Sequence, residues 1–269
     1  VLIAIMTFIV IIGGIKSIGS VAGRVVPAMA LGYILIAIIM LIINAPHVPA
    51  AFISIFTYAF GLEQAAGGLA GYGVLQAIRF GVARGLFSNE AGQGSTAIAH
   101  AAAKTDDPVR QGEIAMLGSF IDTVVICTMT ALVILSVQGT FESGDGVVEY
   151  AWQSTSLQGA QVTTAVFSQG MPYGGFFIAI ALALFAFTTI LGWSYYAEQA
   201  VTYLIGDWAA KPLRFVWVGM VFVGALQPID FIWRFGDIAN ASMAFPNLIA
   251  ILLLSPVVVA MAKEAGRVK

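Results

Sequence analysis

An apolar stretch interrupted by polar residues and glycines is the part of this sequence best suited to bind a small ligand. The segment Gly81–His100 reads GVARGLFSNEAGQGSTAIAH, and its helical pattern runs to Leu86 and resumes after Ala91. The interrupting residues are Phe87, Ser88, Asn89 and Glu90, with Gly85, Gly92 and Gly94 on either side. We predict that the helix unwinds here. Unwound backbone cannot face lipid, because its unpaired N–H and C=O groups are costly there, so it must line a cavity or a ligand.

The interrupted segment offers groups for both ends of an amino acid. Ser88 or Asn89 is suited to cap the second half-helix, whose N–H groups and positive dipole end would attract a carboxylate. Carbonyl groups released from the first half-helix would attract an ammonium group or a cation. This pattern of a discontinuous transporter helix predicts a substrate site at Phe87, Ser88, Asn89 and Gly92. The alternative is a plain cytoplasmic loop between two spans.

Three ionisable residues near this segment are candidates for a gating or structural role. Glu90 could hold a hinge by accepting backbone N–H bonds, or could join an inner gate. Arg84 is its nearest opposite charge in sequence. Asp122 lies inside another apolar run, where an unpaired charge is costly. An intramembrane carboxylate is a functional candidate, but we expect Asp122 to form a structural ion pair with Arg79 or Arg84.

A second candidate site lies in the segment Ala186–Glu198, AFTTILGWSYYAE. The adjacent hydroxyls of Thr188 and Thr189 could add oxygen ligands for sodium, although threonine in a membrane helix often bonds its own i−4 carbonyl. The residues alone favour that second interpretation. Trp193 lies four residues after Thr189, on the same helix face, and could close a small substrate pocket. Ordinary packing or a place in an interfacial tryptophan belt is the equal alternative.

The composition of the chain determines which elements position these residues. Of 269 residues, 59% are hydrophobic and only 10% are charged, whereas a soluble domain has about 25% charged residues. A net charge of −2 does not indicate nucleic-acid binding, and the single Cys127 excludes a disulfide framework. The composition therefore predicts an all-α, polytopic membrane protein.

Continuous apolar runs of about 20 residues mark membrane helices. The alternation expected of a β-barrel is absent from these runs. The segment Val48–Phe60 is apolar but short, and we interpret it as an interfacial or re-entrant helix. The predicted spans are Val1–Ile12, Val25–Ile43, Gly68–Leu86 with a continuation Ala91–Ala103, Ile114–Val137, Gly175–Leu204, Leu213–Leu226 and Ile238–Ala262.

Charges alternate between the connections, and this pattern supports seven spans, because basic connections face the cytoplasm. The basic connections hold Lys16 and Arg24, Lys104 and Arg110, Lys211 and Arg214, and finally Lys263, Arg267 and Lys269. The other connections hold Glu63, then Glu142, Asp145 and Glu149, then Asp230 with Arg234. The longest polar stretch, Gly139–Met171, is predicted to be a solvated outer loop.

Three sequence blocks resemble the alanine or glycine:cation symporter family of the amino acid–polyamine–cation superfamily. The blocks are GLFSNEAGQGS, IAHAAAKT and GSFIDTVVICTMTALVI. The resemblance implies a leucine-transporter-like fold of two inverted five-helix repeats with broken first and sixth helices. Gly68–Ala103 would be the sixth helix, Val1–Ile12 the end of the fourth and Ile238–Ala262 the tenth. It also implies a single transporter domain over residues 1–269 and a C-terminal piece of a longer protein, with the first helices upstream.

The resemblance implies a sodium-coupled symporter of a small neutral amino acid, alanine or glycine, in a bacterial or archaeal cell membrane. A Thr/Ser pair on the eighth helix is the usual sodium ligand pair of this fold, so Thr188 and Thr189 become the expected sodium ligands. No cofactor is expected beyond the coupling ion. Proton coupling is the main alternative. A channel would need rings of like residues, and a membrane enzyme would need paired catalytic groups; the sequence displays neither pattern.

Overall fold

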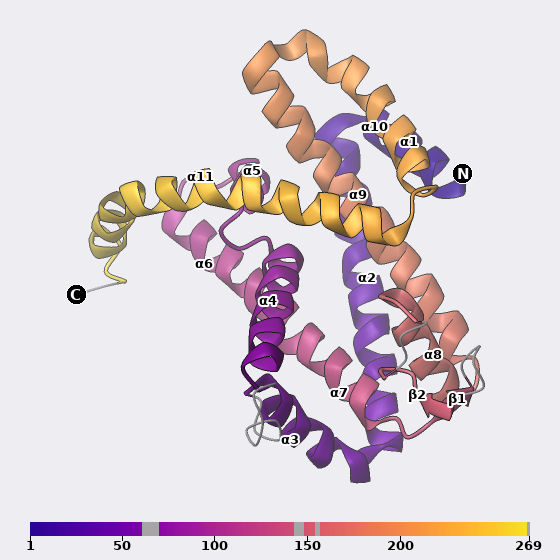
Figure 1. Ribbon diagram of the computed structural model, residues 1–269. Helices are drawn as coiled ribbons and strands as arrows, with labels where there is room; N and C mark the ends of the chain where they lie inside the picture. The colour runs from indigo at the N-terminus through magenta and orange to yellow at the C-terminus, as the bar shows by residue number, and fades with distance from the viewer. Residues whose placement is uncertain (61–69, 143–147, 154–156, 268–269) are drawn as a thin grey trace. The chain divides into compact units, whose positions relative to one another are not determined.

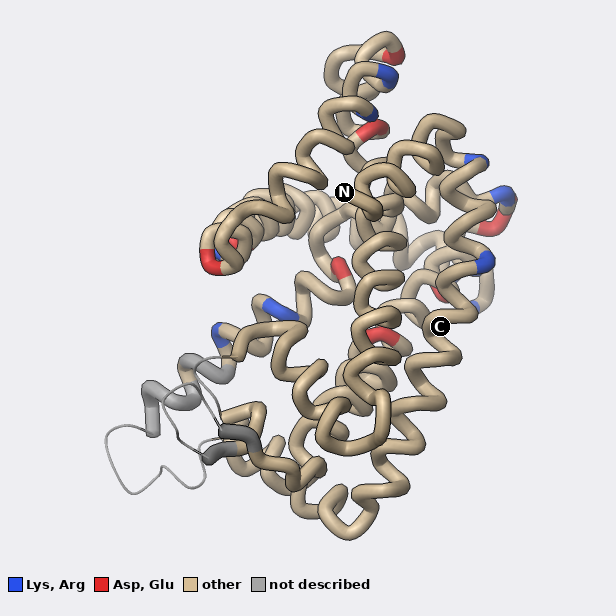
Figure 2. Tube along the Cα trace, turned by 90° about the vertical axis from the view of Figure 1, so that its right-hand side faces the viewer, with Lys and Arg blue, Asp and Glu red and all other residues tan. Residues whose placement is uncertain are grey.

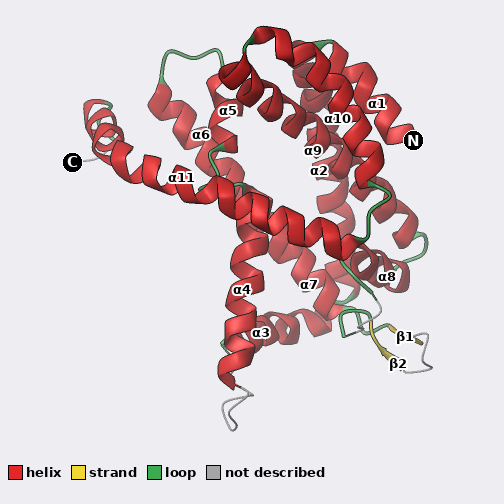
Figure 3. Cartoon of the chain, turned by 45° about the horizontal axis from the view of Figure 1, so that its top comes forward, coloured by secondary structure: helices red, strands yellow, loops and turns green. Residues whose placement is uncertain are grey.

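The computed structural model describes residues 1–60, 70–142, 148–153 and 157–267. Within these ranges the chain is helical apart from two short strands, which are yellow in Figure 3. The predicted outer charges Glu63 and Asp145, the predicted span start Gly68 and the terminal Lys269 lie outside the described residues.

The described elements follow one another along the chain in the order labelled in Figure 1. Here η1 and η3 are 3-10 turns and η2 is a π-helical segment. The elements are α1 (Leu2–Ile12), α2 (Gly14–Ile43), η1 (Ala45–His47), α3 (Val48–Ala59), α4 (Ala70–Asn89), α5 (Ser95–Ala101), α6 (Pro108–Phe120), η2 (Ile121–Cys127), α7 (Thr128–Ser136), β1 (Thr140–Glu142), β2 (Val148–Tyr150), α8 (Ala160–Gly170), α9 (Gly174–Ile205), η3 (Asp207–Ala209), α10 (Ala210–Gly224) and α11 (Ile229–Glu264).

Among the described residues, 4 helical stretches are long and apolar enough to cross a membrane. They are Gly14–Ile43, Pro108–Ser136, Gly174–Ile205 and Ile229–Glu264. This confirms the all-helical, polytopic membrane class predicted from composition. The helices α1, α4 and α10 cover the other predicted spans without meeting both criteria, so the number of seven spans stays a prediction.

The surface of α11 is apolar, as expected of a helix that crosses a membrane. Leu252 and Leu253 expose 73% and 75% of their area, and the stretch Ile238–Ala262 carries no Asp, Glu, Lys or Arg. Figure 2 shows how sparse charged residues are along the described part of the trace. Large contiguous apolar faces of this kind are rare on soluble monomers, and they mark surfaces that contact a membrane or another protein segment.

Several predicted connections differ from the structure: Lys211 and Arg214 lie in α10, and Asp230 and Arg234 lie in α11. The helix α2 begins at Gly14, so Lys16 and Arg24 lie inside it rather than in a loop. Lysine and arginine are good helix formers whose long side chains reach the membrane interface, so they need not end a helix.

The stretch Gly139–Met171 is also more ordered than a solvated loop. It contains the antiparallel pair of β1 and β2 and the helix α8, in which Val166 and Phe167 are buried. The prediction of a solvated loop was wrong for α8, because its apolar residues pack into a hydrophobic core.

The chain divides into two compact units. The first unit comprises Val1–Gly19, Val82–Thr123 and Ile190–Lys269, and the second comprises Ser20–Gly81 and Val124–Thr189. The expectation of a single transporter domain over residues 1–269 stays a prediction.

The second unit is built around a hydrophobic core from α2, α7, α8 and α9. The ring of Tyr33 packs edge-on against Phe185 at 5.8 Å between centroids, and its hydroxyl is hydrogen-bonded to Thr130. The buried members of the core are Tyr33, Ala37, Met40, Val133, Val137, Ala151, Val166, Phe167, Ile178 and Ala181.

In the first unit, α1 packs against α10, and a partly buried arginine joins them to α9. The rings of Phe8 and Phe215 lie 5.6 Å apart. The Arg214 guanidinium donates to both carboxylate oxygens of Glu198, at 2.8 and 2.6 Å, and to the Ile12 carbonyl at 3.0 Å. A cation at the carbonyl end of α1 also offsets the negative end of its macrodipole.

Candidate functional site

The helix predicted to break does so within the first unit. The helix α4 ends at Asn89 and α5 begins at Ser95, and the backbone between them turns through the left-handed region at Glu90 (φ 56°), Gly92 (φ 80°) and Gly94 (φ 85°). A left-handed residue is a common helix terminator, and glycine adopts this conformation without strain. The predicted break is confirmed, but it starts later than expected, since residues 87–89 remain helical.

Neither residue predicted to cap the second half-helix does so. Gly94 precedes α5 and provides no side-chain cap. Asn89 instead accepts a bond from the Ala91 amide through Oδ1, at 2.9 Å, in a local turn of the kind that asparagine favours. Because α5 has only seven residues, its dipole cannot provide the strong carboxylate attraction expected from the sequence.

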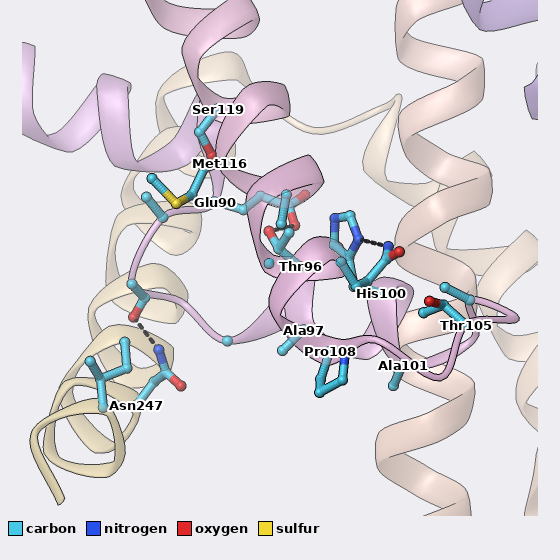
Figure 4. Close-up of a pocket in the computed structure, with 18 of the residues that line it drawn as sticks. Glu90, Thr96, Ala97, His100, Ala101, Thr105, Pro108, Met116, Ser119 and Asn247 are labelled. Carbon is cyan, nitrogen blue, oxygen red and sulfur yellow. Dashed lines mark hydrogen bonds between the residues drawn. The ribbon is translucent and has the colours of Figure 1, made fainter. Parts of the chain in front are cut away.

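Side chains of the protein satisfy several carbonyl groups around the break. Gln93 is only 5% exposed. Its side-chain Nε2 atom donates to the Leu86 carbonyl at 2.9 Å, and its backbone N–H donates to the Glu90 carbonyl at 3.1 Å. Asn247 of α11 donates to the Gly92 carbonyl at 2.8 Å, as Figure 4 shows. Neither of these two amide residues was predicted from the sequence. Gln93 lies in the distinctive FSNEAGQGS block, whereas no local signal marks Asn247.

Asn247 also explains one of the glycines. A Cβ at Gly94 would lie 2.8 Å from the Asn247 Oδ1 atom, which is closer than real Cβ contacts. At Gly92 the nearest atom to such a Cβ is the Leu248 Cδ2 atom at an ordinary 3.7 Å. Gly94 is therefore required by conformation and space, and Gly92 by conformation alone.

The last turn of α4 meets the π-helical segment η2 in a polar cluster. Ser88 Oγ donates to Asp122 Oδ2 at 2.7 Å, and Asn89 Nδ2 donates to Thr123 Oγ1 at 2.9 Å. Thr123 Oγ1 also donates to Asp122 Oδ2 at 3.4 Å. We call these four residues the Asp122 cluster. The predicted ion pair of Asp122 with Arg79 or Arg84 was wrong, because packing of η2 against the end of α4 gives the carboxylate hydroxyl partners.

Arg84 pairs with a residue far along the chain. Its Nη1 and Nη2 atoms lie 2.7 and 3.4 Å from the two carboxylate oxygens of Asp237 on α11. The guanidinium also lies 4.0 Å from the centroid of the Trp233 ring, which contacts Phe87 at 5.7 Å between centroids. Trp233 and Asp237 are four residues apart and therefore share a helix face. Among the described ion pairs, Arg84 therefore has Asp237 as its partner and not Glu90, its nearest opposite charge in sequence.

Glu90 holds the two sides of the break together through hydroxyl groups. Its Oε2 atom accepts from Ser95 Oγ at 2.7 Å and from Thr96 Oγ1 at 3.5 Å. The Tyr196 phenol on α9 is an electrostatic and hydrogen-bonding neighbour of the same carboxylate. In these described hydrogen bonds, the donors to the Glu90 carboxylate are hydroxyl groups and not the backbone N–H groups that were one of the two expectations.

A cavity of about 770 Å³ lies beside the break, between α5, α6 and α11 of the first unit (Figure 4). Its polar lining includes His100, whose Nδ1 atom is 2.6 Å from Gln111 Nε2. Of the predicted substrate-binding residues, Gly92 lines this cavity. The other polar lining residues are Glu90, Thr96, Thr105, Asp106, Ser119 and Asn247.

The candidate residues on α9 divide between the two units. In the second unit, Thr188 Oγ1 donates to the carbonyls of Leu184 and Phe185, at 3.0 and 3.1 Å. In the first unit, Trp193 packs edge-on against Tyr196 at 5.7 Å. The sodium role of Thr188 and Thr189, and the pocket role of Trp193, stay predictions.

Comparison with known proteins then decides the family. The model of the sodium:alanine symporter family matches residues 1–267. The chain belongs to the sodium:alanine symporter family. The resemblance carried by the FSNEAGQGS block is thereby confirmed, and the family is one of transporters, not of enzymes.

Several members of the sodium:alanine symporter family are similar to this chain over nearly its whole length. The sodium/alanine symporter AgcS of Methanococcus maripaludis is 45% identical over 267 residues, which are 99% of this chain and 56% of that protein. The sodium/proton-dependent alanine carrier protein of Bacillus sp. is 38% identical and covers 94% of this chain and 57% of its own length. The amino-acid carrier protein AlsT of Bacillus subtilis is 37% identical, over 99% of this chain and 54% of its own length. The chain thus spans about half the length of these relatives.

The site chemistry of this symporter-family chain is that of hydroxyl, amide and carboxylate oxygens. No group of three or more His, Cys, Asp or Glu residues that could hold a metal ion occurs in the described part of the chain. Transition metals and zinc prefer nitrogen and sulfur ligands, whereas oxygen ligands suit hard cations.

Proposed function

We propose that the full-length protein is a secondary active transporter that couples the uptake of a small neutral amino acid, alanine or glycine, to sodium entry. The observation that carries this proposal is the family match over residues 1–267. The names of two relatives, a sodium/alanine symporter and a sodium/proton-dependent alanine carrier, support alanine and sodium as the transported species. The organisms of these relatives support a bacterial or archaeal cell membrane as the location.

The proposed mechanism is alternating access in a leucine-transporter-like fold. In this assignment α4 and α5 are the two halves of a broken sixth helix of the full-length fold, and α11 is its tenth helix. Seven of the spans of that fold would lie in this chain. The observed break at Glu90–Gly94 supports the assignment, because non-helical backbone at membrane depth is found where it lines a cavity or site.

The proposed substrate site lies at the end of α4. Phe87, Ser88, Asn89 and Gly92 would contact the amino acid, and Trp193 would limit the size of its side chain. Support comes from the polar hydrogen-bonding groups of Ser88 and Asn89 next to the break and from the left-handed backbone at Gly92. Backbone at that glycine can approach a ligand without interference from a side chain.

Thr188 and Thr189 are the proposed sodium ligands. The Thr188 hydroxyl proton is engaged by carbonyls of its own helix, which leaves the oxygen lone pairs as potential acceptors for a cation. Thr189 is more exposed than Thr188, and its hydroxyl is the second proposed oxygen ligand.

Transport by the purified full-length protein in liposomes tests the function. Labelled alanine should accumulate only when sodium is imposed outside, and excess unlabelled alanine or glycine should compete. The second candidate, proton coupling, is favoured by the name of the Bacillus sp. relative. It would give accumulation driven by an inward proton gradient in sodium-free buffer. Alanine flux that follows neither gradient and does not saturate would contradict both forms of the proposal.

A further inference from the structure

Gln93 donates hydrogen bonds across the break between α4 and α5. Its side-chain Nε2 atom donates to the Leu86 carbonyl at 2.9 Å, and its backbone N–H donates to the Glu90 carbonyl at 3.1 Å. Leu86 is one of the last four residues of α4, whose carbonyl groups have no partner within the helix. Gln93 therefore caps the end of the first half-helix from the other side of the break.

A second amide side chain holds the next part of the break. Asn247 of α11 donates from Nδ2 to the Gly92 carbonyl at 2.8 Å, as Figure 4 shows. The backbone at the break turns through the left-handed region at Glu90 and again at Gly92. Such irregular backbone lacks a helical ladder of hydrogen bonds, so its shape depends on the donors that hold its carbonyl groups.

The Gln93 side chain is not the choice that would favour stability alone. It is only 5% exposed, and its Oε1 atom is buried without a hydrogen-bond partner among the described residues. A buried acceptor that is left unpaired costs stability, and a methionine of similar length would avoid that cost. A residue that carries this cost beside a candidate site points to a functional role for its donor group.

Resting on the function proposed above, we propose that Gln93 is a positioning residue for the transported amino acid. Ser88 and Asn89, two of the proposed substrate residues, lie between Leu86 and Glu90, the two residues whose carbonyl groups Gln93 holds. The bond from Nε2 to the Leu86 carbonyl fixes the backbone that carries these two side chains. Gln93 acts through this backbone and does not itself contact the substrate.

Gln93→Met tests the role of the donor, because it keeps the length of the side chain and removes the amide. The purified full-length protein is reconstituted in liposomes, and the alanine concentration for half-maximal sodium-driven uptake is measured. This concentration should rise about fivefold in the variant. Thermal unfolding in detergent is measured on the same preparations. A changed unfolding temperature with an unchanged half-maximal alanine concentration would assign the bond to stability alone and overturn the positioning role.

Gln93→Glu tests the same bond with pH as the switch. A protonated carboxyl group can donate to the Leu86 carbonyl, whereas an ionised carboxylate cannot. The half-maximal alanine concentration is expressed relative to the parent at the same pH, which removes the pH dependence of transport itself. This ratio should be raised at pH 8 and should fall toward one at pH 5.5. A ratio that is the same at both pH values would overturn the proposal.

The matched controls are Gln227→Met and Gln227→Glu. The Gln227 Nε2 atom also donates to a backbone carbonyl, that of Val223 at 3.4 Å, but it is exposed and follows the end of α10. The half-maximal alanine concentration of both controls should match that of the parent at both pH values. If Gln93→Met fails to fold, the pH comparison in Gln93→Glu decides the question. If neither Gln93 variant folds at pH 5.5, the bond serves stability and the positioning role is overturned.

The failure of the proposed function and the failure of this role give different results. Absence of alanine uptake by the parent would contradict the proposed function, and the positioning role with it. Uptake by the parent together with an unchanged half-maximal alanine concentration in a folded Gln93→Met would contradict the role of Gln93 alone.

Discussion

Arg84 on α4 and Asp237 on α11 form an ion pair across 153 positions of sequence, with the closest N–O distance at 2.7 Å. The same guanidinium lies over the Trp233 indole, so a charge contact and a cation–π contact act on one side chain. This pair joins the half-helix that precedes the break to a second long membrane helix within the first unit.

We predict that the Arg84–Asp237 pair is worth about 0.5–1 kcal/mol in a double-mutant cycle of Arg84→Ala and Asp237→Ala. The value is modest because the two side chains are 33% and 46% exposed. Trp233→Leu should remove a further ~1 kcal/mol by losing the stacked ring. Thermal unfolding in detergent is the measurement. The control pair Arg267–Glu113, 54% and 47% exposed, should show almost no coupling, and equal coupling in both pairs would contradict the assignment.

Gly94→Ala should destabilise the protein more than Gly92→Ala. Both glycines have left-handed backbone, so both substitutions carry about 1–2 kcal/mol of conformational strain. Only the alanine at position 94 would also meet Asn247, at 2.8 Å. The unfolding temperatures of the two single variants and of the double variant Gly94→Ala/Asn247→Ala separate the conformational strain from the steric clash with Asn247. If the double variant is no more stable than Gly94→Ala, the clash with Asn247 does not explain the difference between the two glycines.

Asn89→Ala and Gly92→Leu should abolish alanine uptake while leaving membrane insertion intact. Asn89 loses its bonds to the Ala91 amide and to Thr123, and a leucine at Gly92 would fill the space next to the break. Uptake in proteoliposomes and the yield of folded protein on gel filtration are measured together. Normal uptake kinetics in Gly92→Leu would indicate that the segment is an ordinary loop.

Thr189→Val, and to a lesser degree Thr188→Val, should raise the sodium concentration needed for half-maximal alanine uptake. Each substitution preserves shape and deletes one oxygen ligand. A lost contact to a charged partner costs about 1.5–3 kcal/mol, which corresponds to a shift of about tenfold or more. The effect at Thr188 should be smaller, because its hydroxyl is already bonded to Leu184 and Phe185. Unchanged sodium dependence in both variants would leave the pair a role in helix packing only.

Trp193→Ala should admit larger neutral amino acids such as leucine. Removal of the indole would open apolar volume, and each buried methylene of the ligand contributes about 0.8 kcal/mol, so leucine should gain several-fold over alanine. Competition of labelled alanine uptake by leucine is the assay. Trp208→Ala serves as the control, because it removes an indole that is 73% exposed and lies outside the candidate site. Leucine competing equally in the parent and in Trp193→Ala would exclude this side chain from the pocket.

The sequence by itself determined the membrane class, the long helix α9 and the site of the break. These features depend on composition and on local backbone preferences. Apolar runs of sufficient length form helices in lipid, and the glycines after Glu90 permit left-handed turns that end a helix. Neighbouring residues are enough to decide such features.

The tertiary structure decided which polar side chains meet. Arg84 could have paired with Glu90 or Asp122 by sequence distance, yet it pairs with Asp237, while Asp122 accepts from Ser88. Asn247 reaches the Gly92 carbonyl from a helix that carries no local signal of that role. Helical periodicity defines the face on which a side chain lies, but the packing of one helix against another selects its partner. That selection depends on contacts between residues more than 30 and up to about 155 positions apart, which local patterns do not encode.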